Sequence, residues 1–522
     1  MACWHSLPLV RTPERRPMFR ASRISSWWAR RRNRWWCLSD PLSPRFRSPI
    51  QRPPEKVNSY LKTAMKTNVL FPILLAALCG SASAQDPVNI EKAPSSDKET
   101  NSSITFDAEL DGYEVILGEP TVVAQAPPEV TAWGPYQFCD VEKLPNGMLR
   151  ASWHTGQDSA EDHGRVRRAH AVSDDGGRTW RLAEDPFEGI KTADGKSVPS
   201  PILEQDTFGT LLPNGDRLTG ALQPSMPLAQ IDLGESIQPV SMWMQAHGNH
   251  YALYDSDAFP EKYRDWKMRR LPKDSTEWVS DHPSVSIPGF LRPALGGSVL
   301  SMYVTSPYAK QMDVAPDGSL WIAFFGHRVE NGEPWDACGA MFLRSKDAGK
   351  SWDFVGQIPY APTAEDRSDP AKWDGFTEPA LTFFPDGSLF CVLRTCDVTA
   401  ENRPLYWSRS TDAGRTWRQP QVFDRYGVWP GFVRLKNGST ILTFGRPGNF
   451  IRISRDPAGL KWSKKFTILD PALPGCANAG LAAISDDTAI IVYSSFSHPQ
   501  VNSDPAVPVK TILARTITVR PK

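Results

Sequence analysis

A carboxylate and a guanidinium flank a predicted hairpin in the segment FTEPALTFFPDGSLFCVLRT (376–395). Glu378 precedes the first strand of this hairpin, and Arg394 follows 16 residues later at the end of the second strand. Both side chains therefore come to the same end of the hairpin. If the inner strands of such hairpins surround a central pocket, both side chains can face a ligand bound there. The alternative is a structural ion pair.

Two further segments carry polar side chains suited to chemistry. Arg446 ends a predicted strand in LTFGRPGN (442–449), where its planar guanidinium can bind a carboxylate through two hydrogen bonds. The loop HTGQDSAEDHG (154–164) contains two acids and two histidines, which are Asp158, Asp162, His154 and His163. The alternative for Arg446 is a surface position at a turn, and the alternative for the loop acids is a solvated position without a chemical role.

An internal repeat marks the strands that would position these residues. The pattern Ser-x-Asp-x-Gly-x-Ser/Thr-Trp occurs as SDDGGRTW (173–180), SKDAGKSW (345–352) and STDAGRTW (410–417). The Asp can accept hydrogen bonds from the backbone of a tight turn, and the Gly takes a position that needs a positive φ. We expect the Trp of each copy (Trp180, Trp352 and Trp417) to fold back onto the hydrophobic layer of its sheet, outside the central pocket. The segment SRDPAGLKW (454–462) resembles a fourth copy with one inserted residue.

A second repeat counts the sheets. Turns of the Pro-Asn/Asp-Gly kind, each followed by apolar alternation, occur at 144–149, 212–218, 315–320 and 384–389, with weaker copies at 435–440 and 484–489. In four cases a Ser-x-Asp segment follows the turn glycine after 16 to 27 residues, which fits a hairpin, one more strand and the next turn. The sequence therefore predicts an all-β fold, a six-bladed β-propeller of four-stranded blades over residues 106–522.

Two parts of the chain bear on how this ring is completed. The early strand from Tyr113 to Val123 is expected to lie beside the last strand, from Thr511 to Val519, so that no edge stays open. The second blade lacks a recognisable Ser-x-Asp segment and carries an insertion at about 224–300 that is rich in Met, Trp and Pro.

The Ser-x-Asp repeats resemble the Asp-box (BNR) repeats of the sialidase (neuraminidase) superfamily, and the resemblance covers roughly 130–515. The resemblance implies a sialidase-like propeller, and it says less about activity because Asp boxes lie at the periphery of the blades. It implies that Glu378 is the catalytic carboxylate that deprotonates a nucleophile, and that Arg394 and Arg446 bind the substrate carboxylate.

The resemblance also implies a catalytic acid. The acid/base Asp of sialidases lies about a dozen residues before the first Asp box, and Asp162, 11 residues before Ser173, is the nearest match. Asp158 is the alternative. A carboxylic acid at this place can protonate the leaving oxygen if burial raises its pKa.

The sequence departs from the sialidase pattern at two places. The first Arg of the sialidase triad is expected in YQFCDVEKL (136–144), which contains no Arg. The nucleophilic Tyr is expected in GCANAGLAAISDD (475–487), which contains no Tyr, and Tyr493 lies in an apolar strand where we expect it to be core. Retaining sialidases use a neutral phenol because a carboxylate would approach an anionic substrate against charge repulsion. Strict sialidase activity is therefore not expected.

The first 84 residues are predicted to be absent from the mature fold. Residues 65–84 have the anatomy of a secretory signal peptide, with Lys66, an apolar run and the small residues Ala82-Ser83-Ala84 before Gln85. Residues 1–64 carry 14 Lys and Arg against three acids, and we interpret them as an early start assignment rather than a nucleic-acid-binding arm. Residues 85–105 are polar and predict a linker. We expect a secreted or periplasmic protein, cleaved near Ala84.

Composition limits the partners and cofactors. Residues 85–522 hold 44 Lys and Arg against 55 Asp and Glu, and this acidic balance argues against a nucleic-acid partner. No apolar run of about 18 residues beyond the leader predicts a membrane span. No Cys/His spacing indicates a metal, and no cofactor is expected. Most of the five cysteines after the leader are expected to be free and buried: Cys139, Cys338, Cys391, Cys396 and Cys476.

Three functions stay open on these observations. The first is a glycoside hydrolase acting on an extracellular acidic or sulfated glycan with Glu378, Asp162 and the two arginines. The second is a non-catalytic glycan-binding propeller that uses the arginines as an anion clamp. The third is a lyase or other glycosidase that uses His154, or another histidine, with a tyrosine.

Overall fold

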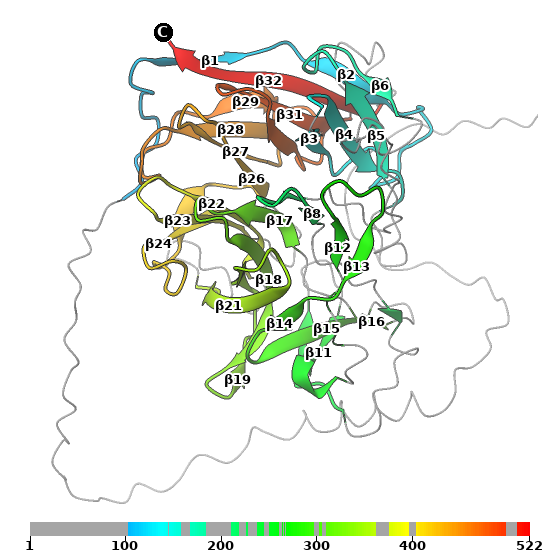
Figure 1. Ribbon diagram of the computed structural model, residues 1–522, viewed down its shortest axis with the longest axis vertical. Helices are drawn as coiled ribbons and strands as arrows, with labels where there is room; N and C mark the ends of the chain where they lie inside the picture. The colour runs from blue at the N-terminus through cyan, green and yellow to red at the C-terminus, as the bar shows by residue number, and fades with distance from the viewer. Residues whose placement is uncertain are drawn as a thin grey trace, which may run out of the picture. The chain divides into compact units, whose positions relative to one another are not determined.

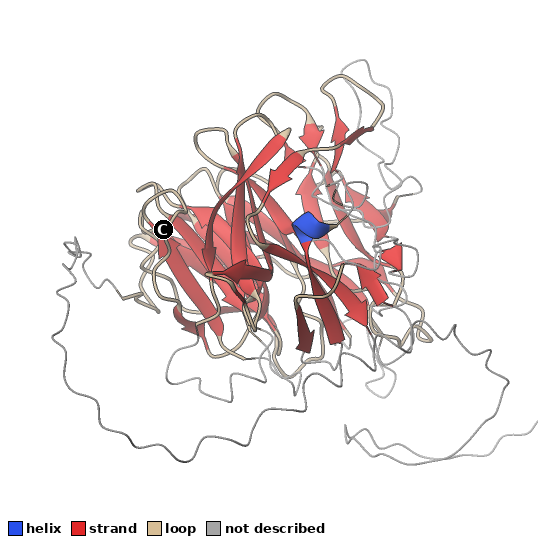
Figure 2. Cartoon of the chain, turned by 90° about the horizontal axis from the view of Figure 1, so that it is seen from below, coloured by secondary structure: helices blue, strands red, loops and turns tan. Residues whose placement is uncertain are grey.

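The computed structural model shows an all-β protein. Among the residues that it describes, η2 (Ser256–Ala258) is the one helical segment, and all other regular structure is β-strand (Figure 2). The predicted early start (1–64), signal peptide (65–84) and most of the predicted linker (85–105) lie outside the described residues. These residues are 103–144, 146–157, 168–183, 210–218, 226–227, 237–244, 250–259, 264, 266, 268–296, 302–304, 309–361, 375–395, 403–496 and 509–522.

Six tight turns form hairpins, as the second repeat predicted. In the five turns with glycine, the glycine N–H donates to the carbonyl three residues earlier, for example from Gly387 to Phe384 at 2.9 Å. These glycines have φ between +80° and +92°, which L-residues rarely adopt. The sixth turn joins β30 (Gly480–Ala483) to β31 (Thr488–Ser495).

Five sheets in the described part of the chain have the form of a propeller blade, an antiparallel ladder of four strands. The first blade contains β3 (Asp140–Lys143), β4 (Leu149–His154), β5 (Arg168–Ser173) and β6 (Arg181–Leu182). The second contains β7 (Thr210–Leu211), β8 (Arg217–Leu218), β12 (Met268–Leu271) and β13 (Val279–Asp281).

The other three blades follow the same pattern further along the chain. One contains β22 (Thr377–Phe383), β23 (Leu389–Arg394), β24 (Leu405–Ser410) and β25 (Gln421–Asp424). The next contains β26 (Val428–Arg434), β27 (Thr440–Gly445), β28 (Asn449–Ser454) and β29 (Phe466–Leu469). The last contains β30, β31, β32 (Thr511–Pro521) and β1 (Tyr113–Leu117), with β2 (Thr121–Gln125) as a fifth strand.

The strands around the 315–320 turn belong to a larger sheet of 11 strands. It contains a blade-like ladder of β17 (Ala309–Val314), β18 (Leu320–Glu330), β20 (Gly339–Ser345) and β21 (Ser351–Ile358). The remaining strands are β9 (Met226–Pro227), β10 (Ser241–Met244), β11 (His250–Asp255), β14 (Ser284–Ser286), β15 (Phe290–Gly296), β16 (Met302–Val304) and β19 (Glu333–Pro334). β15 pairs with the far end of β18 and so joins most of the added strands to the ladder.

The predicted count of six four-stranded blades is therefore wrong. Five sheets have that form, and the ladder after the 315–320 turn is merged with inserted strands into the 11-stranded sheet. The insertion predicted at 224–300 is the physical cause, because its strands continue the sheet. The same region also supplies β12 and β13, which complete the second blade.

The sheets are arranged as a propeller. The first strands of neighbouring sheets pack side by side around an axis, β3 against β30, β30 against β26, β26 against β22, and β22 against β17 and β18. Both β1 and β2 pair with β32, so the N-terminal strands close the last blade (Figure 1). This confirms the predicted pairing of the early strand with the C-terminal strand.

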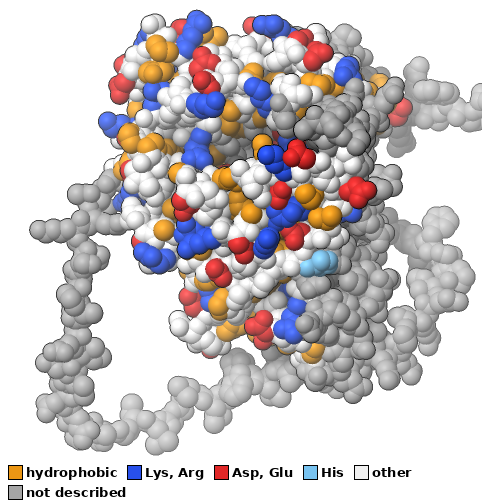
Figure 3. Space-filling view, viewed as in Figure 1, with side chains coloured by type: hydrophobic (Ala, Val, Ile, Leu, Met, Phe, Trp, Pro, Cys, Tyr) orange, Lys and Arg blue, Asp and Glu red, His pale blue; other side chains and the backbone are white. Residues whose placement is uncertain are grey.

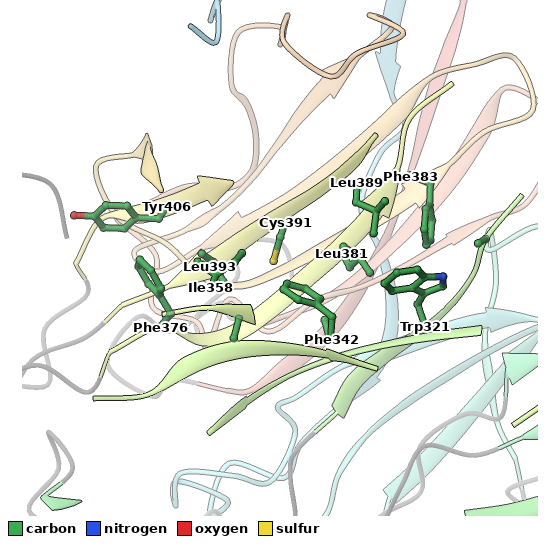
Figure 4. Packing of buried hydrophobic residues seen from close by; sticks show 13 residues of the cluster. Trp321, Phe342, Ile358, Phe376, Leu381, Phe383, Leu389, Cys391, Leu393 and Tyr406 are labelled. Carbon is green, nitrogen blue, oxygen red and sulfur yellow. The ribbon is translucent and has the colours of Figure 1, made fainter. Parts of the chain in front are cut away.

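Large apolar side chains fill the layers between neighbouring sheets. In one cluster, Trp321 and Phe342 from β18 and β20 pack with Leu381 and Cys391 from β22 and β23, and all four are at most 2% exposed (Figure 4). Burial of this kind contributes about 25 cal/mol for each Å² of apolar surface removed from water. The inner strands therefore form a rigid frame for residues at their ends.

The Ser-x-Asp turns hold one sheet to the next. Asp412 accepts hydrogen bonds from Thr416 N at 2.9 Å and Thr416 Oγ1 at 2.7 Å. Burial opposes ionisation of Asp412, but these bonds outweigh it and hold the pKa of this carboxyl below its ordinary value. Trp417 Nε1 donates to Gly414 O at 3.0 Å, and its ring stacks on Phe342 of the preceding sheet at 4.3 Å.

The other Ser-x-Asp turns repeat the tryptophan-to-glycine hydrogen bond, including the degraded copy at 454–462. Against that copy lies the start of the described chain, where Thr105 N donates to Leu460 O at 2.8 Å and Trp462 N donates to Thr105 O at 2.9 Å. Charged side chains of both signs are interspersed over the face shown in Figure 3. Within the described residues, no helix has the length and apolar character to cross a membrane.

Candidate functional site

Four non-glycine residues have left-handed backbone where innermost strands begin. Phe138 (φ 55°) precedes β3, Glu378 (φ 45°) and Trp429 (φ 50°) are the second residues of β22 and β26, and Ala477 (φ 58°) precedes β30. The ladders of β22 and β26 shift register at this point, which is a bulge that re-aims a side chain. Such backbone costs about 1–3 kcal/mol per residue and clusters at functional sites. This end of the ring is therefore the candidate site.

The hairpin of β22 and β23 brings Glu378 and Arg394 together. Arg394 Nη1 donates to Glu378 Oε1 at 2.5 Å, and each side chain is 13% exposed. The backbone N–H of Trp429 donates to the other oxygen, Oε2, at 2.9 Å. The carboxylate is thus held by a cation of its own blade and by a backbone donor of the next blade. Charge-assisted hydrogen bonds of this kind fix its orientation.

Arg446 follows β27 and binds the start of the last blade. Its Nε and Nη2 donate to Cys476 O at 3.1 and 2.6 Å, and Nη2 also donates to Asn478 Oδ1 at 3.0 Å. Its guanidinium lies 5.4 Å from the ring centroid of Trp133, over the ring. Arg446 therefore combines a structural role between two blades with a position beside an aromatic side chain.

Aromatic rings connect the two charged groups. The ring centroids of Trp429 and Phe138 are 6.3 Å apart, and those of Phe138 and Trp133 are 6.4 Å apart. The guanidinium of Arg446 lies over the ring of Trp133. The described contacts of Arg394 run to Glu378, and those of Arg446 run to Trp133 and the last blade. The predicted arginines thus occupy the same end of the ring, on either side of these rings.

Sequence reasoning missed the residues that build this aromatic link. A usable signal existed for Trp429, because Thr377-Glu378-Pro379 and Val428-Trp429-Pro430 place different side chains at the same position before proline. Aligning the starts of the inner strands would have put Trp429 beside Glu378. No comparable signal marks Phe138 or Trp133.

The first blade adds a histidine and an arginine to this end. His154 ends β4, and its ring lies 4.6 Å from that of Phe138. Arg168 begins β5 and donates to Phe138 O and Ser152 Oγ, at 2.7 Å in each case. The segment 136–144 contains no Arg, but a guanidinium from β5 lies against its backbone. His154 is the one residue of the predicted loop set that the structure describes.

Other predicted residues fall into three groups. Asp162, Asp158, His163 and Cys396 lie outside the described residues. Tyr493 is core as predicted, at 1% exposure, and burial raises its pKa to about 12. Four cysteines are free and buried, as expected: Cys139, Cys338, Cys391 and Cys476. In the described part of the chain, no three acidic, histidine or cysteine side chains gather into a metal-binding group.

Comparisons with known proteins place the fold. No protein-family model and no curated protein matches the chain. A solved protein of unknown function from Dyadobacter fermentans is 16% identical, with a TM-score of 0.50 over 78% of this chain and 99% of that one. A Penicillium chrysogenum α-L-arabinanase in complex with arabinobiose is 15% identical, with a TM-score of 0.40 over 76% and 98% of the two chains.

A sialidase from Streptococcus pneumoniae is also similar, at 11% identity and a TM-score of 0.41 over 76% of this chain and 70% of that one. An arabinanase and a sialidase are therefore among the solved structures similar to the chain. At these identities the likeness concerns the fold, and activity has to be argued from the residues of this chain.

Proposed function

We propose that the chain is a sialidase-like glycoside hydrolase that acts on an extracellular acidic glycan at the axial end where Glu378 lies. The convergence at Glu378 carries the proposal: a carboxylate, an arginine of its own blade and the bulged backbone of Trp429 meet beside aromatic rings. Aromatic side chains with a few oriented polar groups suit a sugar ring. Arg394 beside Glu378 and Arg446 beside Trp133 put two cations at this end of the ring, which favours an anionic ligand over a neutral one.

We assign the roles by the resemblance to sialidases, and Asp162 lies outside the described residues. Glu378 takes a proton from the attacking group, and Asp162 donates a proton to the leaving oxygen. Arg394 and Arg446 hold the acidic group of the substrate. Strict sialidase chemistry is not proposed, because the start of the last blade, Cys476-Ala477-Asn478, offers no phenol and Tyr493 is buried.

A non-catalytic glycan-binding propeller is the second candidate. Both oxygens of Glu378 already accept hydrogen bonds, one from Arg394 and one from Trp429 N. A carboxylate held in this way is well placed to orient its neighbours. This arrangement is what favours a binding role.

Substitution of the two proposed catalytic carboxylates tests the enzyme proposal. We expect wild-type protein to release product from at least one member of a panel of acidic and sulfated glycans, followed by chromatography. Glu378→Gln and Asp162→Asn should each lower kcat/KM by about 100-fold or more, the usual contribution of a general acid or base. Asp386→Asn is the matched control, because Asp386 pairs with Arg409 in the same blade at its other end. Binding without turnover supports the second candidate, and neither binding nor turnover contradicts both.

We also propose that the Ser-x-Asp turns are Asp boxes and that the protein is exported. The hydrogen bonding shared by the four turns supports the first point. The apolar run and small residues before Gln85 support the second. N-terminal sequencing should show that the exported protein begins at Gln85. An exported chain that keeps residues 1–64 would contradict the proposed cleavage.

A further inference from the structure

The loop between β2 and β3 holds an exposed tryptophan on a fixed backbone. Lys510 Nζ donates to the carbonyl oxygens of Ala132 and Pro135, on either side of Trp133, the latter at 3.1 Å. The fully buried side chain of Gln137 accepts a hydrogen bond from the backbone N–H that follows Trp133, at 3.1 Å. The indole is thus presented by a backbone that is tied down on both sides.

The indole ring itself is also positioned. The rings of Phe138 and Phe496 stand nearly perpendicular to it, at 89° and 85°, with centroids 6.4 and 6.1 Å away. The guanidinium of Arg446 lies over the ring, 5.4 Å from its centroid. Even with these three neighbours, Trp133 is 42% exposed. A large apolar surface therefore faces solvent in a fixed orientation beside the candidate site.

The size of this surface indicates the class of ligand. Among the exposed large hydrophobic side chains that the structure describes, Trp133 is the one aromatic. A stable protein interface needs about 800 Å² on each partner, far more than one indole offers. A single sugar ring fits, because its C–H face is apolar and its rim of hydroxyls stays in water. Fixing the indole beforehand lowers the entropy cost of binding.

We propose that Trp133 is the stacking platform of a sugar-binding subsite at the axial end, and that it takes a glycan ring by its apolar face, whatever the charge of the ring. The inference deepens the proposed function and rests on it. The guanidinium of Arg446 lies over the indole, and the preference for acidic glycans comes from the two arginines of the proposed site and not from the indole. The substrate class is then a glycan of at least two rings, one of them acidic.

Calorimetry with matched probes tests the platform. The probes are 3′-sialyllactose, trigalacturonate and a heparin disaccharide, each also as its carboxyl methyl ester. We expect Trp133→Ala to weaken binding of the acid and of its ester by the same factor, on the order of tenfold. Trp133→Phe should give an intermediate affinity. Leu182→Ala, which removes another exposed apolar side chain (64% exposed, on β6), should leave both affinities unchanged.

The outcomes separate this inference from the function on which it rests. If Trp133→Ala binds both forms as tightly as wild type, the platform is overturned and the glycan-binding function stands. If wild-type protein binds none of the probes, the proposed function is overturned and the platform with it. Should Trp133→Ala fail to fold, tryptophan fluorescence of Trp133→Phe replaces it. A ligand-induced change as large as that of wild type then overturns the proposal.

Discussion

One carboxylate at the candidate site accepts hydrogen bonds from residues of two blades. Glu378 accepts hydrogen bonds from Arg394 on β23 and from the backbone of Trp429 on β26. Without Arg394, the negative charge of Glu378 would lose its cationic partner and would repel a bound anion more strongly. Like charges at this range repel, so under the proposed function Arg394 both attracts the acidic ligand and shields it from the carboxylate.

Arg394→Ala should therefore weaken binding of an acidic glycan at least tenfold, while its methyl ester is scarcely affected. Each charge-assisted hydrogen bond contributes about 1.5–3 kcal/mol, which corresponds to that factor or more. Calorimetry with both ligands measures the difference. Arg409→Ala is the control, since Arg409 pairs with Asp386 in the same blade. Equal losses for both ligands, or none for either, would show that Arg394 is structural.

Sequence predicted some of the site residues and not others for a physical reason. The pairing of Glu378 with Arg394 was predictable, because a tight turn fixes the register of a hairpin and so the partner at its end. Trp429 acts partly through its backbone N–H, which every residue except proline possesses. Phe138 and Trp133 meet other blades only after the ring forms, and spacing along the chain carries no trace of such contacts.

At the scale of single elements, the Ser-x-Asp turns show how one blade fits its neighbour. Gly414 has φ +82°, and a Cβ there would stand 3.0 Å from the ring of Trp321 in the preceding sheet. Gly387 has nearly the same backbone, φ +84°, and a Cβ there would meet nothing within 4 Å. A comparison of substitutions at these two glycines, which belong to one blade, therefore distinguishes the cost of backbone strain from the cost of overpacking between sheets.

Gly414→Ala should lower the free energy of unfolding by about 2–4 kcal/mol, from left-handed strain and overpacking together. Gly387→Ala should cost only the strain, about 1–2 kcal/mol. Urea unfolding of both variants, followed by tryptophan fluorescence, gives the comparison. Equal losses would mean that Trp321 moves aside without cost and that the turn does not set the spacing of the sheets.

The same scale shows where the fold could be predicted. Each of the six turns has a local signal in glycine, asparagine or aspartate, and each forms a hairpin. The predicted number of blades was wrong because β15 pairs with a distant part of β18. Leu291 pairs with His327, 36 positions further along the chain. Pairing at that distance depends on the assembled sheet, so turn signals alone do not reveal it.

At the scale of the whole ring, one partly buried acid forms ion pairs that join two blades. Glu142 on β3 forms ion pairs with Arg150 on β4 and with Arg217 on β8 of the second blade, at 2.8 Å in the second case. Burial alone would raise the pKa of Glu142, but the charges of Arg150 and Arg217 outweigh it and lower the pKa below its ordinary value. Glu142 therefore stabilises the fold above the pKa of the unfolded chain, and this contribution is lost as the pH falls through the lowered pKa.

Glu142→Gln should lower the free energy of unfolding at pH 7 by about 3–5 kcal/mol, because two buried guanidinium groups lose their counter-charge. The difference in unfolding free energy between wild type and Glu142→Gln should narrow as the pH falls below the ordinary pKa of a glutamate and towards the lowered pKa of Glu142, where the wild-type carboxyl becomes neutral as well. Urea unfolding at several pH values measures both effects. Glu114→Gln is the control, an exposed pair with Arg520 that should change little. A gap that does not depend on pH would contradict this account.

The pairing of β2 with β32, which closes the ring, also determines when the fold can be completed during synthesis. Thr121 on β2 hydrogen-bonds to Ala514 on β32 across 393 positions of sequence. A ribosome adds about 5–20 residues per second, so β32 is synthesised roughly 20–80 s after its partner strand β2. The anchor of the Trp133 loop, Lys510, emerges in the same final stretch. The proposed glycan binding at the axial end should therefore appear only after β32 has been made, and a chain truncated before β32 should show none.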